Sequence, residues 1–403
     1  MDRLTNTVRP YAWGSTTAIP DLLGTEPTGQ PQAELWLGAH PGDPSRIDRG
    51  AGPVPLTEVI AGDPRAELGE AERFGERLPF LLKVLAAAAP LSLQVHPDLT
   101  QARHGHAAEE ERGIPLDAPE RNYKDAHHKP ELISALTPFE GLCGFRPAAE
   151  AADLLEGLGL PDLLPYVDLL RAKPQDEALR EVLTAVLSAP REEIAATVRH
   201  AARAMTCLSE QGGPYATEYA AYAAVARDYP GDPGVLAAML LNPVHLEPGE
   251  AMYLGVGVPH AYLSGTGVEI MAASDNVLRC GLTPKHVDVP ELLRVVRFEP
   301  TAPAVLRPGP DSAYDTPVDD FRLYRHDLDD GPLHLCGPQD APVPQILLCT
   351  DGSAELTAAD GQHLELRRGE SAYLPAAQSP VHVSGSGTLF RASVGGRPQQ
   401  LTQ

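Results

Sequence analysis

The chain has 403 residues, 43% of them hydrophobic, and a chain of this length is expected to build more than one core and to fold as two or three domains. Its 55 acidic and 32 basic residues give a net charge of −23, which argues against a partner that requires a basic surface, such as a nucleic acid or an anionic membrane. The 41 prolines and 36 glycines favour many short strands and turns over a long helical bundle.

Cysteine usage and the first residues of the chain predict a cytoplasmic protein. The five cysteines are odd in number, widely spaced and free of any Cys-x-x-Cys pair, which is typical of a reducing compartment, and we expect all of them to be core thiols: Cys143, Cys207, Cys280, Cys336 and Cys349. The N-terminus has no charged segment followed by an apolar stretch, and the longest apolar run, 81–93, is interrupted by Lys83 and Pro90. Neither export nor membrane insertion is expected.

The first hundred residues are expected to form strands and loops. Residues 1–60 surround short apolar runs with turn formers. The segment 79–97 predicts two more strands, 80–85 and 91–95, joined by a turn, although its run of alanines is also compatible with a helix. Because apolar residues alternate in the second strand, Gln94 and His96 are expected to leave the same face. One strand thus offers two side chains that can ligate a metal ion.

Two later segments add further ligands. A polar stretch at 97–129 is expected to form a helix and a long loop, and loops of this length are uncommon unless functional. The strand that follows contains Glu131, and the segment Gly-Val-Gly-Val-Pro-His ends at His260. Together with Gln94 and His96, these residues form a four-group set of nitrogen and oxygen ligands of the kind that binds zinc or a similar first-row ion.

Residues 146–240 change to helical periodicity. Apolar residues recur three and four positions apart in 148–158, 176–187 and 190–208. The last of these segments carries an apolar stripe formed by Ile194, Val198, Ala201, Met205 and Leu208. Further helices are expected at 218–225 and 234–241. A helical insertion between two β segments is the simplest account.

From 243 onward the strand-and-turn rhythm returns, with a proline-rich linker at 298–312. The segment 246–267 aligns without gaps to 366–387, which lies 120 residues later. The identical pairs are Leu246/Leu366, Gly249/Gly369, Glu250/Glu370, Tyr253/Tyr373, Leu254/Leu374, Ser264/Ser384, Gly265/Gly385 and Gly267/Gly387. We therefore expect two copies of one β unit.

The first copy contains a recognisable metal-site pattern. Gly249 is followed, after five residues, by Gly-Val-Gly-Val-Pro-His at 255–260, which resembles the second cupin motif with glycine in place of its usual proline. Cupins are small jelly-roll barrels in which this histidine points inward to a metal. The second copy keeps Gly369 but has Pro380 where His260 would recur, so we expect it to bind no metal at this position.

The whole chain resembles the type I mannose-6-phosphate isomerases, also called phosphomannose isomerases. The most specific segments are Leu-Ser-Leu-Gln-Val-His-Pro at 91–97, His-Lys-Pro-Glu at 128–131, Pro-His-Ala-Tyr at 259–262 and Ser-Asp-Asn-Val-Leu-Arg-Cys-Gly-Leu-Thr-Pro-Lys at 274–285. The resemblance implies one zinc ion per chain, held by Gln94, His96, Glu131 and His260. It also implies a substrate pocket lined by Arg279, Asp275, Lys285, Glu269, Lys129 and Ser92.

Such enzymes interconvert mannose 6-phosphate and fructose 6-phosphate, which requires a proton to move between neighbouring carbons through a cis-enediol. A metal ion and a fixed guanidinium, that of Arg279, suit the negative charge that develops on the substrate oxygens. The sequence leaves the proton carrier open among a water molecule at the metal, Lys129, Asp275 and Glu269. The candidates for binding the phosphate end are Lys285, Lys83 and, as a hydrogen-bond donor, Ser92.

Other interpretations stay open from the sequence alone. Arg279 is also placed to pair with Asp275, four residues earlier, and Lys285 to be a solvated turn residue. The alternative function is a non-catalytic, metal-binding bicupin that senses or stores a sugar phosphate. An iron cupin oxygenase is disfavoured by Gln94 in place of a histidine and by the absence of a compact His-x-His-x-x-x-Glu motif.

The expected fold is mainly β with a helical insertion, that is, two cupin-type jelly-roll barrels plus an α-helical domain. The catalytic cupin is expected to span 1–145 and 242–300, with the helical insertion at 146–241 and a degenerate cupin at 313–403. We expect a monomer that takes a small sugar phosphate as substrate and has no nucleic-acid or membrane partner.

Overall fold

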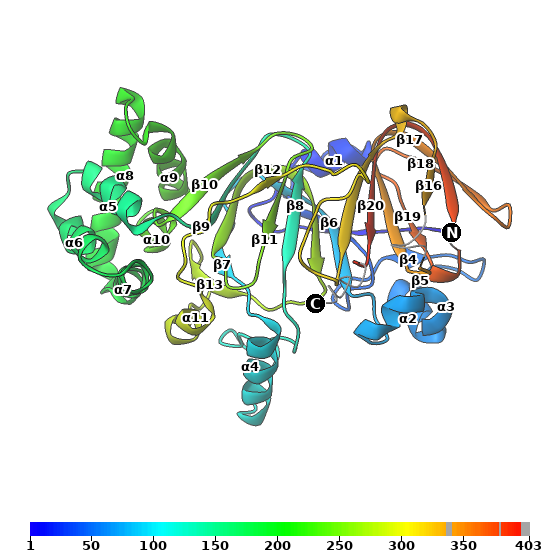
Figure 1. Ribbon diagram of the computed structural model, residues 1–403, viewed down its shortest axis with the longest axis horizontal. Helices are drawn as coiled ribbons and strands as arrows, with labels where there is room; N and C mark the ends of the chain where they lie inside the picture. Colours follow the sequence, from blue (N-terminus) through cyan, green and yellow to red (C-terminus); the bar gives the residue numbers. More distant parts are fainter. Residues whose placement is uncertain (336–340, 379, 396–403) are drawn as a thin grey trace, which may run out of the picture.

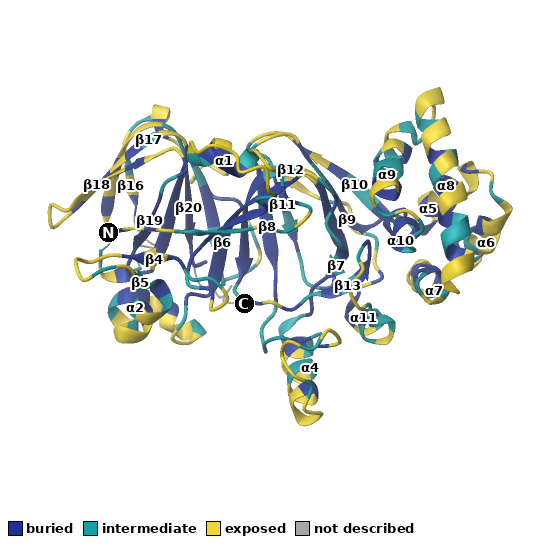
Figure 2. Ribbon diagram, turned by 180° about the vertical axis from the view of Figure 1, so that it is seen from behind, coloured by how far each residue is buried: buried dark blue, intermediate teal, exposed yellow. Residues whose placement is uncertain are grey.

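The computed structural model describes residues 1–335, 341–378 and 380–395. Two large antiparallel sheets lie side by side along the long axis of the molecule, and a block of helices extends from the outer end of one of them (Figure 1). Figure 2 shows that the strands are largely buried, whereas the helical block turns exposed faces outward. The chain is therefore mostly β-sheet with a separate helical portion.

The first sheet has eleven strands, and β12 is its central element. The first residues of β12 pair with β7 and β9, and its later residues pair with β6 and β8. The strands are β2 (Thr7–Arg9), β3 (Glu34–Leu37), β6 (Phe80–Ala87), β7 (Leu93–Val95), β8 (Glu131–Ala135), β9 (Phe139–Phe145), β10 (Leu241–Leu246), β11 (Ala251–Leu254), β12 (His260–Ala272), β13 (Leu278–Gly281) and β14 (Val305–Leu306). One strand thus brings His260 and Glu269 to the same region of the fold.

The second sheet has seven strands, and the N-terminal strand β1 belongs to it through its pairing with β19. Its strands are β1 (Asp2–Arg3), β15 (Arg322–Asp327), β16 (Leu333–Leu335), β17 (Gln345–Ala358), β18 (His363–Arg367), β19 (Ser371–Leu374) and β20 (Val381–Ser393). A separate two-stranded sheet consists of β4 (Arg46–Ile47) and β5 (Val54–Pro55). The two large sheets share one apolar core, to which the first contributes Phe80 and Ile270 and the second Ile346 and Phe390.

The internal repeat of the sequence is visible in the backbone. Strands β11 and β19 lie 120 residues apart, and each follows a glycine with positive φ, 87° at Gly249 and 84° at Gly369. In the long strands that come next, Gly265 and Gly385 have no room for a side chain. A Cβ added at Gly265 would lie 2.7 Å from a backbone oxygen, and one added at Gly385 would lie 2.1 Å from a backbone oxygen. The repeated glycines therefore serve the turns and close strand contacts of the fold.

The predicted helical insertion is confirmed as a block of six helices between β9 and β10. They are α5 (Ala148–Gly157), α6 (Leu164–Ala172), α7 (Gln175–Ser188), α8 (Arg191–Gln211), α9 (Ala216–Asp228) and α10 (Gly234–Ala238). Of these, α6 was not predicted. The stripe on α8 faces the core as expected, because Ile194, Val198, Ala201 and Met205 are buried.

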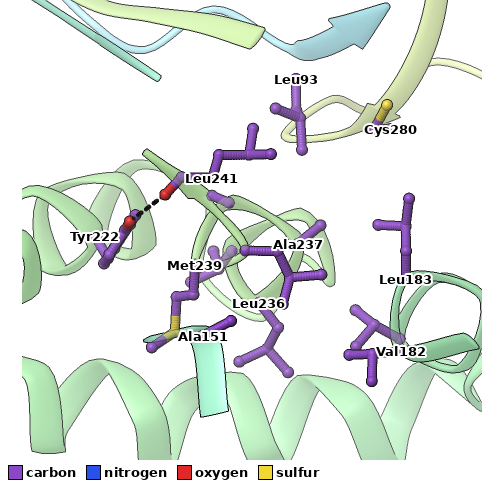
Figure 3. Close-up of a cluster of buried hydrophobic side chains, with 14 of the residues drawn as sticks. Leu93, Ala151, Val182, Leu183, Tyr222, Leu236, Ala237, Met239, Leu241 and Cys280 are labelled. Carbon is purple, nitrogen blue, oxygen red and sulfur yellow. Dashed lines mark hydrogen bonds between the residues drawn. The ribbon is translucent and has the colours of Figure 1, made fainter. Parts of the chain in front are cut away.

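The helical block packs directly behind the strands that carry predicted site residues. Its apolar cluster includes Leu93 of β7 and Cys280 of β13 (Figure 3). In the same cluster the hydroxyl of Tyr222 donates a hydrogen bond of 2.7 Å to the carbonyl of Leu241, which joins α9 to β10. The block therefore supports β7 and β13 from the side opposite to the site.

The remaining helices surround the sheets. They are α1 (Ala18–Leu23), α2 (Leu56–Gly62), α3 (Pro64–Leu68), α4 (Leu99–Glu111) and α11 (Val289–Val295), with 3₁₀ turns η1 (Gly69–Phe74), η2 (Pro161–Leu163), η3 (Leu328–Asp330) and η5 (Ala376–Gln378). The predicted helix and loop after position 97 are confirmed by α4, which begins with a capping box formed by Asp98 and Gln101. Among the described residues, no helix is both long and apolar enough to cross a bilayer.

The structure excludes one alternative and changes one expectation. The alanine run is not helical, because β6 extends to Ala87. Cys207 is exposed on α8 and is not a core thiol; it faces outward because the buried stripe of this helix runs through other positions. The expectation of burial holds for Cys143, Cys280 and Cys349, whereas Cys336 lies outside the described residues.

Candidate metal centre

Three strands of the first sheet bring three predicted ligands together. His96 directly follows β7, Glu131 begins β8 and His260 begins β12. The Nε2 atoms of both histidines lie 3.4 Å from the same carboxylate oxygen, Oε2 of Glu131. All three side chains are at most 2% exposed. This is a compact donor set in the interior of the protein.

The hydrogen bonds behind the set orient both imidazoles. Nδ1 of His96 lies 2.8 Å from the carbonyl of Asn276, and Nδ1 of His260 lies 3.0 Å from that of Val258. Because a carbonyl only accepts, each Nδ1 carries the proton and each Nε2 presents its lone pair to the centre. Neither Nε2, nor Oε2 of Glu131, has a hydrogen-bond partner. Three buried acceptors facing one point fit a cation there.

Gln94, the fourth predicted ligand, is placed near the set by strand register. It lies opposite His260 in the pairing of β7 with β12, and opposite Arg279 in the pairing of β7 with β13. Directly opposed residues on antiparallel strands project from the same face. Gln94 and Arg279 therefore share the face of the sheet from which His260 projects.

The charges around the set favour the metal-binding protonation states. Burial lowers the pKa of His96 to about 4, so its imidazole is neutral at pH 7. Burial alone would raise the pKa of Glu131, but the ammonium of Lys129, 3.0 Å away, holds it well below its usual range. A neutral imidazole and an ionised carboxylate are the forms that bind a metal ion.

We expect the metal-free protein to lose stability on acidification. The folded-state pKa of His96 is depressed from 6.5 to about 4, so its contribution is present above the unfolded-state pKa and is lost as the pH falls. Between pH 7.5 and pH 5 this amounts to about 2 kcal/mol. Urea unfolding at several pH values in the presence of a chelator measures this change in the free energy of unfolding. The His96→Gln variant should show a flatter pH dependence, and an equally steep one would contradict the assignment.

Next to the donor set lies a buried ion network on β3, β6 and β12. The ammonium of Lys83 is 3.1 Å from Oε2 of Glu269 and 3.7 Å from Oε1 of Glu34. Burial lowers the pKa of Lys83, but the two carboxylates outweigh it and the net shift is upward; burial raises the pKa of Glu269. The hydroxyl of Tyr262 donates a 2.8 Å hydrogen bond to Glu269. The predicted residues Lys83 and Glu269 are thus partners of one another.

Arg279 does not pair with Asp275, the alternative that the sequence left open. Among the described residues no carboxylate lies within salt-bridge distance of Arg279, and burial lowers its pKa. Partial burial of its ammonium and the charges of Arg279 and Lys124 lower the pKa of Lys285. Lys285 itself is exposed, and Ser92 is half-buried directly before β7. A local group of cations thus exists in a strongly acidic chain.

A cavity of about 490 Å³ lies beside these groups. Asp275 and the imidazole of His40 both line it, together with Arg77, Lys124 and His127. The carboxylate of Asp275 faces His40 at 3.3 Å and is 55% exposed, so it is open to the cavity. The lining also includes Glu76 and Asp125, so a small polar molecule that enters here meets three carboxylates and two cations.

Sequence reasoning missed four residues of this region: Tyr262, Glu34, His40 and Lys124. Tyr262 had a usable signal, because it stands two positions after His260 and therefore projects from the same face of β12. The other three come from segments with no local pattern, and only the tertiary fold brings them near the site.

Comparisons with known proteins agree with this geometry. Residues 1–148 match the family model of the phosphomannose isomerase type I catalytic domain, and residues 312–394 match that of the mannose-6-phosphate isomerase cupin domain. The chain is 44% identical over 400 residues to mannose-6-phosphate isomerase of Escherichia coli, covering 97% of this chain and 99% of the relative. It is 32% identical to the human enzyme of that name, covering 95% and 91%. The crystal structure of mannose 6-phosphate isomerase from Salmonella typhimurium bound to its substrate and to zinc superposes with a TM-score of 0.88 at 40% identity, covering 98% of this chain and 99% of that one.

Proposed function

We propose, because the chain belongs to the type I phosphomannose isomerase family, that it interconverts mannose 6-phosphate and fructose 6-phosphate at one bound zinc ion. The observation that carries this conclusion is the convergence of three buried, unpartnered acceptors, those of His96, Glu131 and His260, on one point. Gln94 is the fourth ligand, supported by its register opposite His260. The zinc ion polarises the substrate oxygens and makes the neighbouring carbon-bound proton more acidic.

Asp275 is the group best placed to move the proton between C-2 and C-1. Its carboxylate is open to the cavity. Burial raises its pKa, but the contact with His40 and the charges of Lys129 and Lys83 together outweigh burial and hold the pKa below the usual value, so it is ionised at neutral pH. Glu269 is 2% exposed and already bonded to Lys83 and Tyr262, and Lys129 is bonded to Glu131. Glu269 therefore neutralises the charge of Lys83, and Lys129 orients the carboxylate of Glu131.

Three cations, of which Lys124 lines the cavity, take the charged parts of the substrate. Arg279, on the same face as Gln94, stabilises the negative charge of the cis-enediol intermediate, because it is partly buried and has no carboxylate partner among the described residues. Lys285 and Lys124 bind the phosphate, with Ser92 as a hydrogen-bond donor. Lys83 remains paired with Glu34 and Glu269 and does not contact the substrate; it acts only through the electrostatic potential of the ion network.

The domain organisation that we propose follows the sequence division. The catalytic cupin barrel comprises 1–145 and 242–300, the α-helical domain 146–241 and the degenerate cupin barrel 313–403. Two observations support it: the helices α5 to α10 fall within 146–241, and the cupin model matches 312–394. We further propose a cytoplasmic monomer without a nucleic-acid or membrane partner, in keeping with the net charge of −23.

The proposal is tested by incubating the purified protein with mannose 6-phosphate in D₂O. Fructose 6-phosphate should form, and deuterium from the solvent should appear at C-1, because the proton passes through a group that exchanges with water. The alternative, a non-catalytic bicupin, predicts bound zinc without any interconversion. That outcome would contradict the isomerase assignment.

A further inference from the structure

His40 occupies a defined place beside Asp275. It lies three residues after β3, is 7% exposed and packs its ring edge-on against Trp36, with ring centroids 4.9 Å apart and an interplanar angle of 80°. It lines the same cavity as Asp275. The imidazole is therefore held by its surroundings and is not free to turn away.

The backbone selects the tautomer of this imidazole. The N–H of Gly42 donates a 3.1 Å hydrogen bond to Nδ1 of His40. Nδ1 must therefore be unprotonated, and the ring proton of the neutral imidazole sits on Nε2. Nε2 faces Oδ2 of Asp275 at 3.3 Å. A buried N–H thus lies next to the carboxylate that is open to the cavity.

Asp275 has few other restraints on its side chain. Its backbone N–H donates to Oδ2 of Asp125 at 2.8 Å, which fixes the main chain and adds a second negative charge nearby. The cations that act on it, Lys129 and Lys83, do so at longer range. Among the described residues, His40 is the side chain in direct polar contact with the carboxylate of Asp275.

We infer that His40 is a positioning residue, which holds the Asp275 carboxylate ionised and aimed at the substrate through its Nε2–H. The inference rests on the proposed isomerase function and assigns His40 a role in it. His40 itself touches neither the ligand set nor the ion network around Lys83. Its effect should therefore fall on turnover and on the pH profile, while the zinc content stays unchanged.

Two substitutions separate positioning from packing. Glutamine places its amide nitrogen near the position of Nε2, so His40→Gln keeps the donor to Asp275. Asparagine reaches only as far as Nδ1, so His40→Asn keeps an acceptor for Gly42 and loses the donor to Asp275. His245→Asn is the matched control, because it removes the contact of a histidine Nε2 with a carboxylate at the surface, that of Glu247 at 3.1 Å.

For His40→Asn we expect kcat to fall about 10- to 100-fold, the fold-change equivalent of one hydrogen bond to a charged group, with KM nearly unchanged. The acid limb of the kcat/KM profile should move to higher pH, because loss of the donor raises the pKa of Asp275. His40→Gln should stay within about fivefold of the unsubstituted enzyme, and His245→Asn should match it.

Equal losses in both His40 variants would overturn the inference, because packing alone would explain them. So would unchanged kinetics in His40→Asn, or loss of zinc or of the folded state in both variants. Failure of the proposed function is a different result: the unsubstituted protein itself would then not turn over mannose 6-phosphate.

Discussion

His260→Ala is expected to abolish zinc binding and to lower kcat/KM for isomerisation at least about 1,000-fold, the scale of losing the metal from a metal-dependent site. The physical reason is that His260 supplies one of three buried acceptors, and its removal leaves Glu131 facing His96 and Lys129 alone. Metal analysis of the purified variant, together with its turnover of mannose 6-phosphate, measures both effects.

The chain contains its own control for this experiment. Pro380 occupies the position of His260 in the second copy of the repeat and is exposed. Pro380→Ala should therefore leave both zinc content and turnover unchanged. The reverse pattern, zinc lost from the Pro380 variant and kept by the His260 variant, would place the metal in the second sheet and contradict the proposed site.

Lys83→Met is expected to destabilise the protein by about 3 kcal/mol at pH 8, because it leaves buried carboxylates without their shared cation. In the unsubstituted protein the ammonium of Lys83 lies between Glu34 and Glu269 and 5.5 Å from the centre of the Trp36 ring. Urea unfolding measures the change in the free energy of unfolding.

The pH dependence of this variant identifies the cause. Without Lys83 the pKa of Glu269 should rise further above its unfolded value, so the stability it contributes is present at low pH and is lost as the pH rises. The defect should thus be smaller at pH 6 than at pH 8. The double variant Lys83→Met, Glu269→Gln is the control and should recover part of the loss. A pH-independent defect that the second substitution does not relieve would point to packing.

Local patterns predicted the parts of the fold that depend on neighbouring residues. The 120-residue repeat located β11 and β19, and the apolar stripe of α8 predicted its buried face. That Gln94 and His96 leave the same face of one strand stays a prediction from periodicity, because β7 ends at Val95. The repeat also distinguishes residues that the fold needs from residues that a metal site needs, because the second copy keeps the glycine at position 369 but has proline where the first copy has His260.

Relations between distant segments could not be predicted in this way. The pairing of Lys83 with Glu269 requires β6 to lie beside β12, and the contact of His40 with Asp275 joins residues 235 positions apart. The four-residue spacing suggested that Asp275 pairs with Arg279, and the sequence alone gave no reason to reject that pair. Which charges pair inside the site depends on which strands lie side by side, and local periodicity does not predict that order.

The most direct test of the central claim is a zinc titration of the metal-stripped protein with activity followed at each step. Because we propose that Gln94, His96, Glu131 and His260 form one site, we expect isomerase activity to be absent at the start, to rise in proportion to bound zinc and to reach its maximum at one zinc ion per chain. Full activity of the stripped protein, or saturation with zinc without any activity, would contradict a zinc-dependent isomerase built on these four side chains.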